Sequence, residues 1–357
     1  MKVVSSGTFG NLHCQGIAVD QRKGYIYYSF TTRFVKSDME GNILGTVEGI
    51  VGHLGCIDFH EADGRVYASL EYKNDEIGRG VRSALGIGED FVSHAFYVAI
   101  FDVDKIDRMG MDAEGDGVMR AVYLPTVVGD FGGTTVQGGR ELAHIHGCGG
   151  MDGIAWGPDF GAGKEGKEFL HIAYGIRSDL TRTDNDYQVF LQYDAETWWD
   201  TLALPLRQGA MHKKGPEEPR HKYFAYTGNT EWGVQNMEYD AHTGDYFLCV
   251  YRGQKPQFPN YPMYVLDGSK PPVSAPLRGY DPPVAGLTLT LRDTGEREGE
   301  ISGMTFPHGS TGFFAAGDGT YLVSEPFSAP SGEQGTRVRR YRLDRTGEKW
   351  VFVLDGE

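Results

Sequence analysis

Side chains that bind metals or move protons recur at the start of short apolar segments in this chain. They are His13 with Gln15, His53, His144 with His146 and Asp152, Glu231 with Gln235, and Glu300 with Ser302. Neutral imidazole suits Mn, Fe, Zn, Cu or Ni, whereas an all-oxygen set favours Ca or Mg. Neighbouring carboxylates can orient an imidazole or act as a general base. Brought together, these residues would form either a divalent-metal site or a polar channel that holds ordered water.

A second set of residues follows apolar segments instead of preceding them. Basic residues occur at an equivalent place in four successive segments, at Arg33, Lys73, Arg177 and Arg252. Arginine can hold a carboxylate, sulfate or phosphate through two parallel hydrogen bonds. We therefore expect these residues to bind an anionic group, with Trp232 stacking against a sugar ring. The alternatives are that the basic residues pair with neighbouring acids and that the aromatic residue packs between blades.

An internal repeat indicates the elements that must position both sets. Residues 13–29 and 53–69 align without a gap, so that His13 matches His53 and Gly24 matches Gly64. Each copy is a short apolar strand, a polar turn and an aromatic-rich strand. A repeat of about 40 residues with this content is typical of a β-propeller blade.

The same pattern returns near residues 153, 236 and 303. It predicts an all-β fold, a single β-propeller domain over residues 1–357, with five blades of four antiparallel strands. A six-bladed ring is the alternative, with its extra blade in 104–145 around residues 120–124. Residues 2–5 are expected to add an edge strand that helps to close the ring.

The strand order of a propeller blade predicts which face carries the function. The entry to the inner strand and the loop after the second strand lie on the same face, so both sets of residues should meet there. Long loops are predicted at 74–94, 104–145, 205–230 and 268–299, and long loops carry function. The short segments 20–24, 61–64 and 240–244 are predicted to be structural turns on the opposite face.

Composition excludes several classes of partner. The chain has 49 acidic and 34 basic residues and a formal net charge of −15, which opposes binding to nucleic acids and anionic membranes. The sequence contains no run of about 18 apolar residues that could span a membrane.

The four cysteines lack paired spacing, which favours buried thiols over disulfides or a zinc site. We expect a cytoplasmic protein, or a secreted or periplasmic one whose signal peptide has been removed. The absence of any Asn-x-Ser/Thr site is compatible with a bacterial source.

The repeated Gly-Ile-x-x-Asp and Gly-x-Ile-Tyr-Tyr-Ser motifs resemble those of gluconolactonase-like propellers and of propeller lyases with a histidine-bound metal. The histidine-rich axis is similar to that of oligogalacturonate lyase, in which His and Gln residues hold a divalent metal. This resemblance implies that His13, His53, His146 and Gln235 bind a divalent metal (Mn, Zn or Ca). It does not identify the substrate.

Together these features predict an enzyme that acts on an anionic carbohydrate or sugar acid at the propeller axis, as a metal-assisted lyase or hydrolase. Glu300, Glu231 or Asp152 would move the proton, while the basic set Arg33, Lys73, Arg177 and Arg252 would hold the charged substituent. One alternative is a metal-free glycoside hydrolase that uses Glu231 and Glu300. The other is a non-enzymatic propeller that binds a ligand or a partner protein. The expected substrate is a small molecule or an oligosaccharide, and the sequence does not address the oligomeric state.

Overall fold

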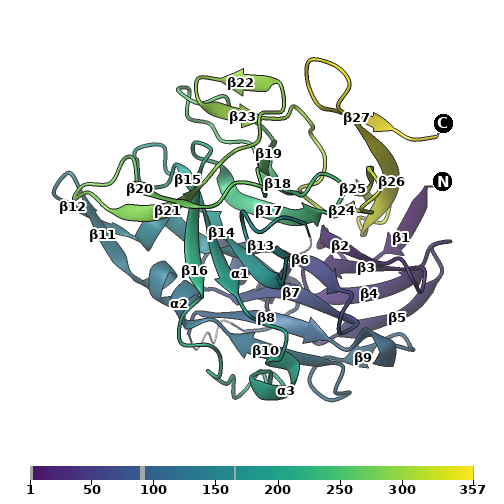
Figure 1. Cartoon of the computed structure of the whole chain (residues 1–357). Helices are drawn as coiled ribbons and strands as arrows, with labels where there is room; N and C mark the ends of the chain where they lie inside the picture. The colour runs from purple at the N-terminus through teal and green to yellow at the C-terminus, as the bar shows by residue number, and fades with distance from the viewer. Residues whose placement is uncertain (1–2, 89–92, 165, 357) are drawn as a thin grey trace.

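Five inner strands surround a common axis in the computed structural model of this chain (Figure 1). The structure describes residues 3–88, 93–164 and 166–356. Successive inner strands contact one another and the last contacts the first, so the ring is closed. The fold is therefore a five-bladed β-propeller, as the repeat predicted. The inner strands are β2 (Cys14–Asp20), β6 (His53–His60), β13 (Cys148–Pro158), β17 (Glu231–Asp240) and β24 (Phe313–Ala315).

Antiparallel strands extend the first two blades outward. Blade 1 continues through β3 (Tyr25–Phe30), β4 (Arg33–Asp38) and β5 (Ile43–Glu48), with β9 (Met111–Asp112) added in parallel at its edge. Blade 2 continues through β7 (Arg65–Tyr72), β8 (Ala95–Phe101) and β10 (Met119–Tyr123). Because β10 is the outer strand of blade 2, the segment 120–124 does not form a sixth blade.

Blade 3 has more than four strands and blade 4 has fewer. Blade 3 continues through β14 (Glu168–Ile176), β15 (Tyr187–Tyr193), β16 (His221–Tyr226), β21 (Ala285–Leu289) and β20 (Val273–Pro276). Blade 4 has only β18 (Asp245–Tyr251) and β19 (Met263–Leu266) outside its inner strand, plus single bridges to Leu291 and Met304. The chain after β19 crosses to blade 3, where β21 pairs with β16, and so leaves blade 4 one strand short. It then returns through the hairpin of β22 (Glu296–Glu298) and β23 (Ile301–Gly303).

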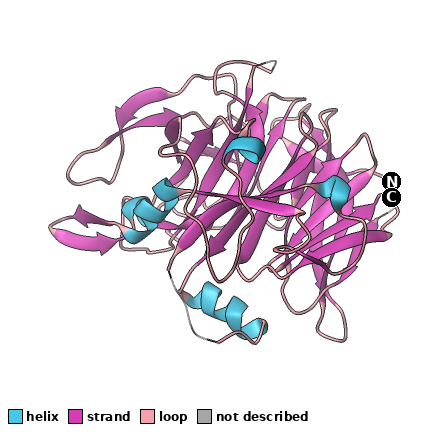
Figure 2. Ribbon diagram, turned by 90° about the horizontal axis from the view of Figure 1, so that it is seen from below, coloured by secondary structure: helices cyan, strands magenta, loops and turns pink. Residues whose placement is uncertain are grey.

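Blade 5 joins the two ends of the chain. It contains β25 (Thr320–Ser328) and β26 (Gln334–Asp344), and β26 pairs with both β1 (Val4–Thr8) and β27 (Val351–Leu354). Figure 2 shows the N- and C-termini side by side. The edge strand expected at 2–5 is thus present as β1, although residue 2 lies outside the described residues.

Aromatic residues on the strands pack between neighbouring blades. Phe34 of blade 1 stacks on Phe101 of blade 2 with ring centroids 4.2 Å apart, and His60 of blade 2 stacks on Trp156 of blade 3 at 3.7 Å. Aromatic side chains bury large apolar areas, which is why they recur at these strand positions.

The hairpins on the face opposite the long segments have the expected turn chemistry. The Asp20 carboxylate accepts hydrogen bonds from the backbone N–H groups of Arg22 and Lys23, both at 3.0 Å, and Asp240 does the same for His242 and Thr243. Gly24 closes its turn at φ 70°, a conformation that glycine adopts without steric cost.

Several segments predicted to be loops contain short elements, some of them helices that lie outside the strands (Figure 2). In 74–94, α1 (Glu76–Ala84) begins where Asp75 accepts a hydrogen bond from the Gly78 N–H at 2.9 Å. None of the described helices is long and apolar enough to cross a membrane. The remaining elements are η1 (Val103–Lys105), α2 (Pro125–Gly132), β11 (Thr134–Gln137), β12 (Arg140–Ala143), η2 (Ile145–Gly147) and α3 (Trp198–Thr201).

Candidate functional site

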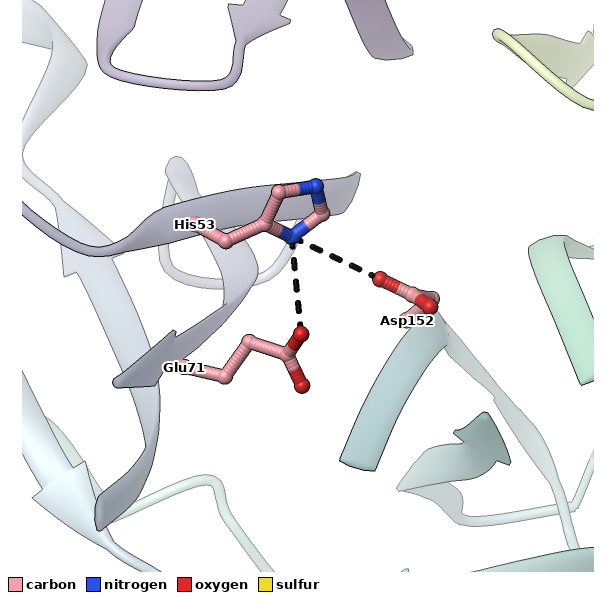
Figure 3. A group of neighbouring side chains, drawn as sticks. All are labelled: His53, Glu71 and Asp152. Atoms are coloured by element: carbon pink, nitrogen blue, oxygen red, sulfur yellow. Dashed lines mark ion pairs between the residues drawn. The ribbon is translucent and has the colours of Figure 1, made fainter. Parts of the chain in front are cut away.

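Three side chains from three strands meet beside the propeller axis. His53 is the first residue of β6, and Glu71 on β7 lies directly opposite it in the antiparallel pair. Opposite residues of such a pair present their side chains on the same side of the sheet. Asp152 comes from β13, the inner strand of the next blade, which contacts both β6 and β7. Figure 3 shows the His53 ring and the two carboxylates turned toward one another.

His53 lies close to both carboxyl groups without a hydrogen bond to either. His53 Nδ1 lies 3.7 Å from Glu71 Oε1 and 3.7 Å from Asp152 Oδ1. These distances are too long for hydrogen bonds, and the buried Nδ1 atom has no hydrogen-bond partner among the described residues. One ligand atom from each residue lies within 4.8 Å of the other two.

Neighbouring groups fix both carboxylates. Lys73 Nζ lies 2.5 Å from Glu71 Oε1, 2.9 Å from the Gly149 carbonyl oxygen and 3.4 Å from Asp75 Oδ2. The Met151 N–H donates to Glu71 Oε2 at 3.1 Å, and Gln235 Nε2 donates to Asp152 Oδ2 at 3.3 Å. The cluster is therefore held by hydrogen bonds and ion pairs from outside it.

Burial controls the protonation of the cluster. It raises the pKa of Glu71 to about 7, although the Lys73 ammonium opposes this shift, and it raises the pKa of Asp152 to about 6 against the same ammonium. Burial also lowers the pKa of His53 to about 4, despite the nearby Glu71 carboxylate. His53 is thus neutral at pH 7, with a lone pair available on one ring nitrogen.

The donor set fits a divalent cation. Ligand atoms held about 2.1–2.4 Å from a cation lie about 3–3.5 Å apart when adjacent, and further apart when opposite. The observed 3.7 Å separations need only a small inward movement of the side chains. The orphaned His53 Nδ1 is the observation that favours a cation here, because a buried polar atom without a partner is costly.

The cluster forms part of the wall of a cavity of about 370 Å³. One side of this axial cavity is polar and includes His13, Gln15 and Thr31; Gln15 Nε2 lies 3.2 Å from His13 Nε2 and donates to Thr31 Oγ1 at 3.0 Å. Helix α1 supplies an apolar side through Ile77 and Val81. The cavity is large enough for a small organic ligand.

The structure brings together three of the four residues expected to bind metal. His13, His53 and Gln235 line the axial cavity. His146 does not line it: its Nδ1 lies 2.8 Å from the Tyr280 hydroxyl, and its ring packs against Phe224. His146 belongs to the 3₁₀ turn η2, which precedes β13, and it has a positive φ of 57°. It is therefore not part of the inner strand, whose side chains alternate between the two faces of the sheet.

Of the three carboxylates expected to be catalytic, only one lies in the axial cavity. Asp152 is part of the cluster, but Glu231 and Glu300 do not line the axial cavity. Glu231 begins β17 opposite Tyr251. Glu300 is exposed and forms an ion pair with Arg278.

The basic set does not converge either. Lys73 and Trp232 line the axial cavity, whereas Arg33, Arg177 and Arg252 do not. The Arg33 guanidinium pairs with Glu48 at 3.1 Å, and Arg252 Nε donates to the Asn260 carbonyl oxygen at 2.8 Å. The Arg177 guanidinium lies over the Phe131 ring, 5.8 Å from its centroid. Arg33 and Lys73 therefore pair with neighbouring acids, which is the alternative stated for this set, whereas Arg252 binds a backbone carbonyl.

Sequence reasoning missed Glu71 as a member of the site. The signal available was the hairpin register, because counting outward from the turn at 61–64 places the end of β7 opposite the start of β6. A bulge between Leu54 and Ile57 shifts that count by one residue and gives Glu71, rather than its neighbour, the place opposite His53.

All four cysteines are free and buried, as expected. Burial raises the pKa of the Cys14, Cys56 and Cys148 thiols to about 12. Buried thiols with raised pKa values favour the protonated form at neutral pH, which is the packing role expected for them.

No protein-family model matches the chain, and no curated protein matches it. Among solved structures, the chain is similar to a GH43 endo-arabinanase from Bacillus licheniformis, with 12% identity over 94% of this chain and 97% of that one and a TM-score of 0.40. It is also similar to the periplasmic gluconolactonase PpgL of Pseudomonas aeruginosa, with 10% identity, 95% and 84% coverage and a TM-score of 0.36. A gluconolactonase from Xanthomonas campestris has 9% identity, 94% and 88% coverage and a TM-score of 0.30. Gluconolactonase propellers are thus among the structures that this chain resembles.

Proposed function

We propose that this chain is a carbohydrate-active hydrolase whose reaction takes place in the axial cavity. The observation that carries the proposal is the cluster of His53, Glu71 and Asp152, whose ligand atoms lie within 4.8 Å of one another in the wall of that cavity. Amide and hydroxyl groups such as those of Gln15 and Thr31 are suitable partners for sugar hydroxyls. The Trp232 ring offers a flat apolar surface for a sugar ring.

The two carboxyl groups suit different steps of a hydrolysis. With a pKa of about 7, Glu71 is partly protonated at neutral pH and can donate a proton to the leaving oxygen. With a pKa of about 6, Asp152 is mostly ionised and can accept a proton from the attacking water. Lys73 and Gln235 keep the two carboxyl groups oriented for these roles.

The same three residues would instead hold a divalent cation in a metal-dependent form of the reaction. A cation bound there keeps both carboxyl groups ionised, so it would replace the acid role given above to Glu71. When bound, such a cation supplies Lewis-acid polarisation of an oxygen and lowers the pKa of a water molecule. The neutral imidazole of His53 and the lack of a hydrogen-bond partner for its Nδ1 among the described residues support this assignment. Of the three metals expected, manganese and zinc fit this set better than calcium, because it combines an imidazole nitrogen with carboxylate oxygens and calcium prefers oxygen ligands alone.

The charge of the cavity favours hydrolysis over elimination by a lyase. Elimination by a sugar lyase acts on a substrate that carries a carboxylate, and this carboxylate needs a free cationic side chain to hold it in addition to any bound metal ion. Among the described residues that line the axial cavity, Lys73 is the only lysine or arginine, and its ammonium already pairs with Glu71 and Asp75. A hydrolase needs no such free cation from the protein.

The proposal is tested by activity and metal content measured on the same purified protein. We expect turnover of a glycoside, sugar ester or sugar lactone. Turnover that is highest at pH 6–7 and survives a chelator would assign the acid and base roles to Glu71 and Asp152, whereas turnover lost on treatment with a chelator would assign the cation. Adding back Mn²⁺, Zn²⁺ or Ca²⁺ should then restore the lost turnover. His53→Ala should lower the bound metal, and Glu71→Gln and Asp152→Asn should each lower kcat by at least about 100-fold.

Glu300→Gln is the matched control, since Glu300 is an exposed carboxylate outside the cavity. It should leave both activity and metal content unchanged. Wild-type turnover in Glu71→Gln and Asp152→Asn would overturn the proposal. Loss of turnover in Glu300→Gln alone would move the catalytic role to that residue.

A further inference from the structure

A second cavity opens directly beside the axial one. It has a volume of about 620 Å³ and shares His13 and Tyr251 with the axial cavity. Its walls come from the segment before β24, the end of β25 and the first residue of β26, all in blade 5. The two cavities therefore form one path from the axis outward over blade 5, which we call the blade 5 groove.

The groove is lined by hydroxyl, amide and aromatic groups, together with the imidazoles of His13 and His308. Hydroxyls of Ser310 and Ser328, the Gln334 amide and the Phe327 ring line it, and none of its described lining residues is Asp, Glu, Lys or Arg. The axial cavity, by contrast, contains Glu71, Lys73 and Asp152. A charged ligand would lose hydration in the groove without gaining a counter-charge, whereas a neutral hydroxyl-rich ligand would exchange its water for these partners.

Contacts within blade 5 hold the lining groups in place. Ser328 Oγ donates to Gln334 Oε1 at 3.1 Å, and Gln334 Nε2 donates to the Gly332 carbonyl oxygen at 3.1 Å. The guanidinium of Arg337 lies over the Phe327 ring, 4.4 Å from its centroid, and is not among the groove-lining residues. A side chain held in one position loses less entropy when a ligand binds, so these residues are pre-arranged for binding.

We propose that the blade 5 groove binds a neutral oligosaccharide chain whose terminal sugar enters the axial cavity. This inference rests on the proposed function and names its substrate class. His13 and Tyr251 lie where the two cavities meet, so they would contact the sugar next to the one that reacts. The Phe327 ring supplies an apolar surface for a sugar further along the chain.

Calorimetric binding to the Glu71→Gln protein tests the inference without turnover. The probes are neutral gluco-, xylo- and arabino-oligosaccharides of two to six sugars, and galacturonate oligomers of the same lengths. For at least one neutral series we expect Kd to fall by at least about tenfold from two to six sugars, with the uronates weaker by a similar factor. Affinity that does not change with length in every neutral series, or tighter binding of the uronates, would overturn the inference.

Two serine substitutions in the same turn region provide a matched pair. Ser328→Arg places a charged side chain in the groove, whereas Ser331→Arg places it on an exposed turn outside the groove lining. Ser328→Arg should weaken binding of the six-sugar chain by at least about tenfold and leave the two-sugar affinity unchanged, while Ser331→Arg changes neither. Equal effects of the two variants would contradict the inference.

Failure of this inference is distinguishable from failure of the proposed function. Turnover of a small sugar lactone or glycoside, together with affinity that is independent of chain length, would support the hydrolase function and contradict oligosaccharide binding in the groove. Length-dependent binding in a protein that turns over none of the substrates would support oligosaccharide binding in the groove and contradict the hydrolase function.

Discussion

At the scale of single residues, the ammonium of Lys73 stabilises the two neighbouring carboxyl groups of the His53, Glu71 and Asp152 cluster. Only 3% of its side chain is exposed, and it faces Glu71, Asp75 and the Gly149 carbonyl oxygen. Two carboxylates as close as Glu71 and Asp152 repel each other when both are ionised. A buried cation beside them offsets part of that repulsion and of the loss of hydration.

Replacing Lys73 with methionine should therefore destabilise the protein. The change removes the cation and leaves buried carboxyl groups unpaired, at a cost of about 3–5 kcal/mol in the free energy of unfolding measured by urea denaturation. Adding Glu71→Gln to Lys73→Met should recover part of that loss, because the carboxylate no longer lacks a partner. Lys349→Met is the control: its exposed pair with Glu296 should contribute less than about 1 kcal/mol. Strict additivity of the two site substitutions would contradict this account.

The sequence predicted part of the site because repeats place equivalent residues side by side. His13, His53, Asp152 and Gln235 were all expected at the axis from their place at the entries to inner strands. His146 was misplaced because a 3₁₀ turn with a positive φ precedes β13, and no pattern in the sequence signals that turn. Glu71 was missed because a bulge sets its register, and bulges depend on tertiary contacts more than on local sequence.

At the scale of the strand, the close approach of β13 to Glu71 requires glycine. Gly150 has a φ of 123°, and a Cβ atom at this position would lie 2.2 Å from Glu71 Oε2 and 3.0 Å from Lys73 Nζ. The backbone of β13 thus reaches the ion pair with no room for a side chain. Next to it, a Cβ on Gly149 would meet nothing closer than 3.4 Å.

These neighbouring glycines allow a paired prediction. Gly150→Ala should displace the Glu71 carboxylate and lower turnover by about 100-fold, since a shift of about 1 Å in a catalytic group has an effect of that size. It should also lower the thermal midpoint, because alanine is strained at that φ. Gly149→Ala should stay within about 0.5 kcal/mol of wild type in stability. Comparable loss of turnover and stability in both variants would show that the close approach is not what positions Glu71.

The inner strands also carry a buried carboxyl pair at the other end of the axis. Asp58 accepts a hydrogen bond from the Trp156 N–H at 2.6 Å, and Glu238 accepts one from the Ala315 N–H at 2.8 Å. Each bond joins one blade to the next. Burial raises the pKa of Asp58 to about 7 and that of Glu238 well above its usual value, so burial favours protonation of this pair more than of an exposed pair. Carboxyl groups line a cavity at both ends of the axis, but at this end they also join neighbouring blades.

At the scale of the whole molecule, sequence periodicity predicted the ring but not its asymmetry. The ungapped pair 13–29 and 53–69 became the first two strands of blades 1 and 2, since apolar and aromatic patterning directly determines which strands pack between blades. The six strands of blade 3 and the three of blade 4 follow from where the chain goes after β19. That path is set by the parallel pairing of β21 with β16, a long-range contact without a local signature.

Closure of the ring by β1 gives a prediction for the whole molecule. Val4 is 2% exposed and lies opposite Val338, which is fully buried, whereas Val3, the residue before it, is 43% exposed. Val4→Asp should place an unpaired charge inside blade 5 and lower the free energy of unfolding by about 2–4 kcal/mol, because burying a charge without a partner is costly. Val3→Asp adds the same charge to the surface and should change stability by less than about 0.5 kcal/mol. The two proteins should differ clearly in the urea midpoint, since separation of β1 from β26 opens the blade that joins the two ends of the chain. Equal midpoints would mean that the ring stays closed without β1.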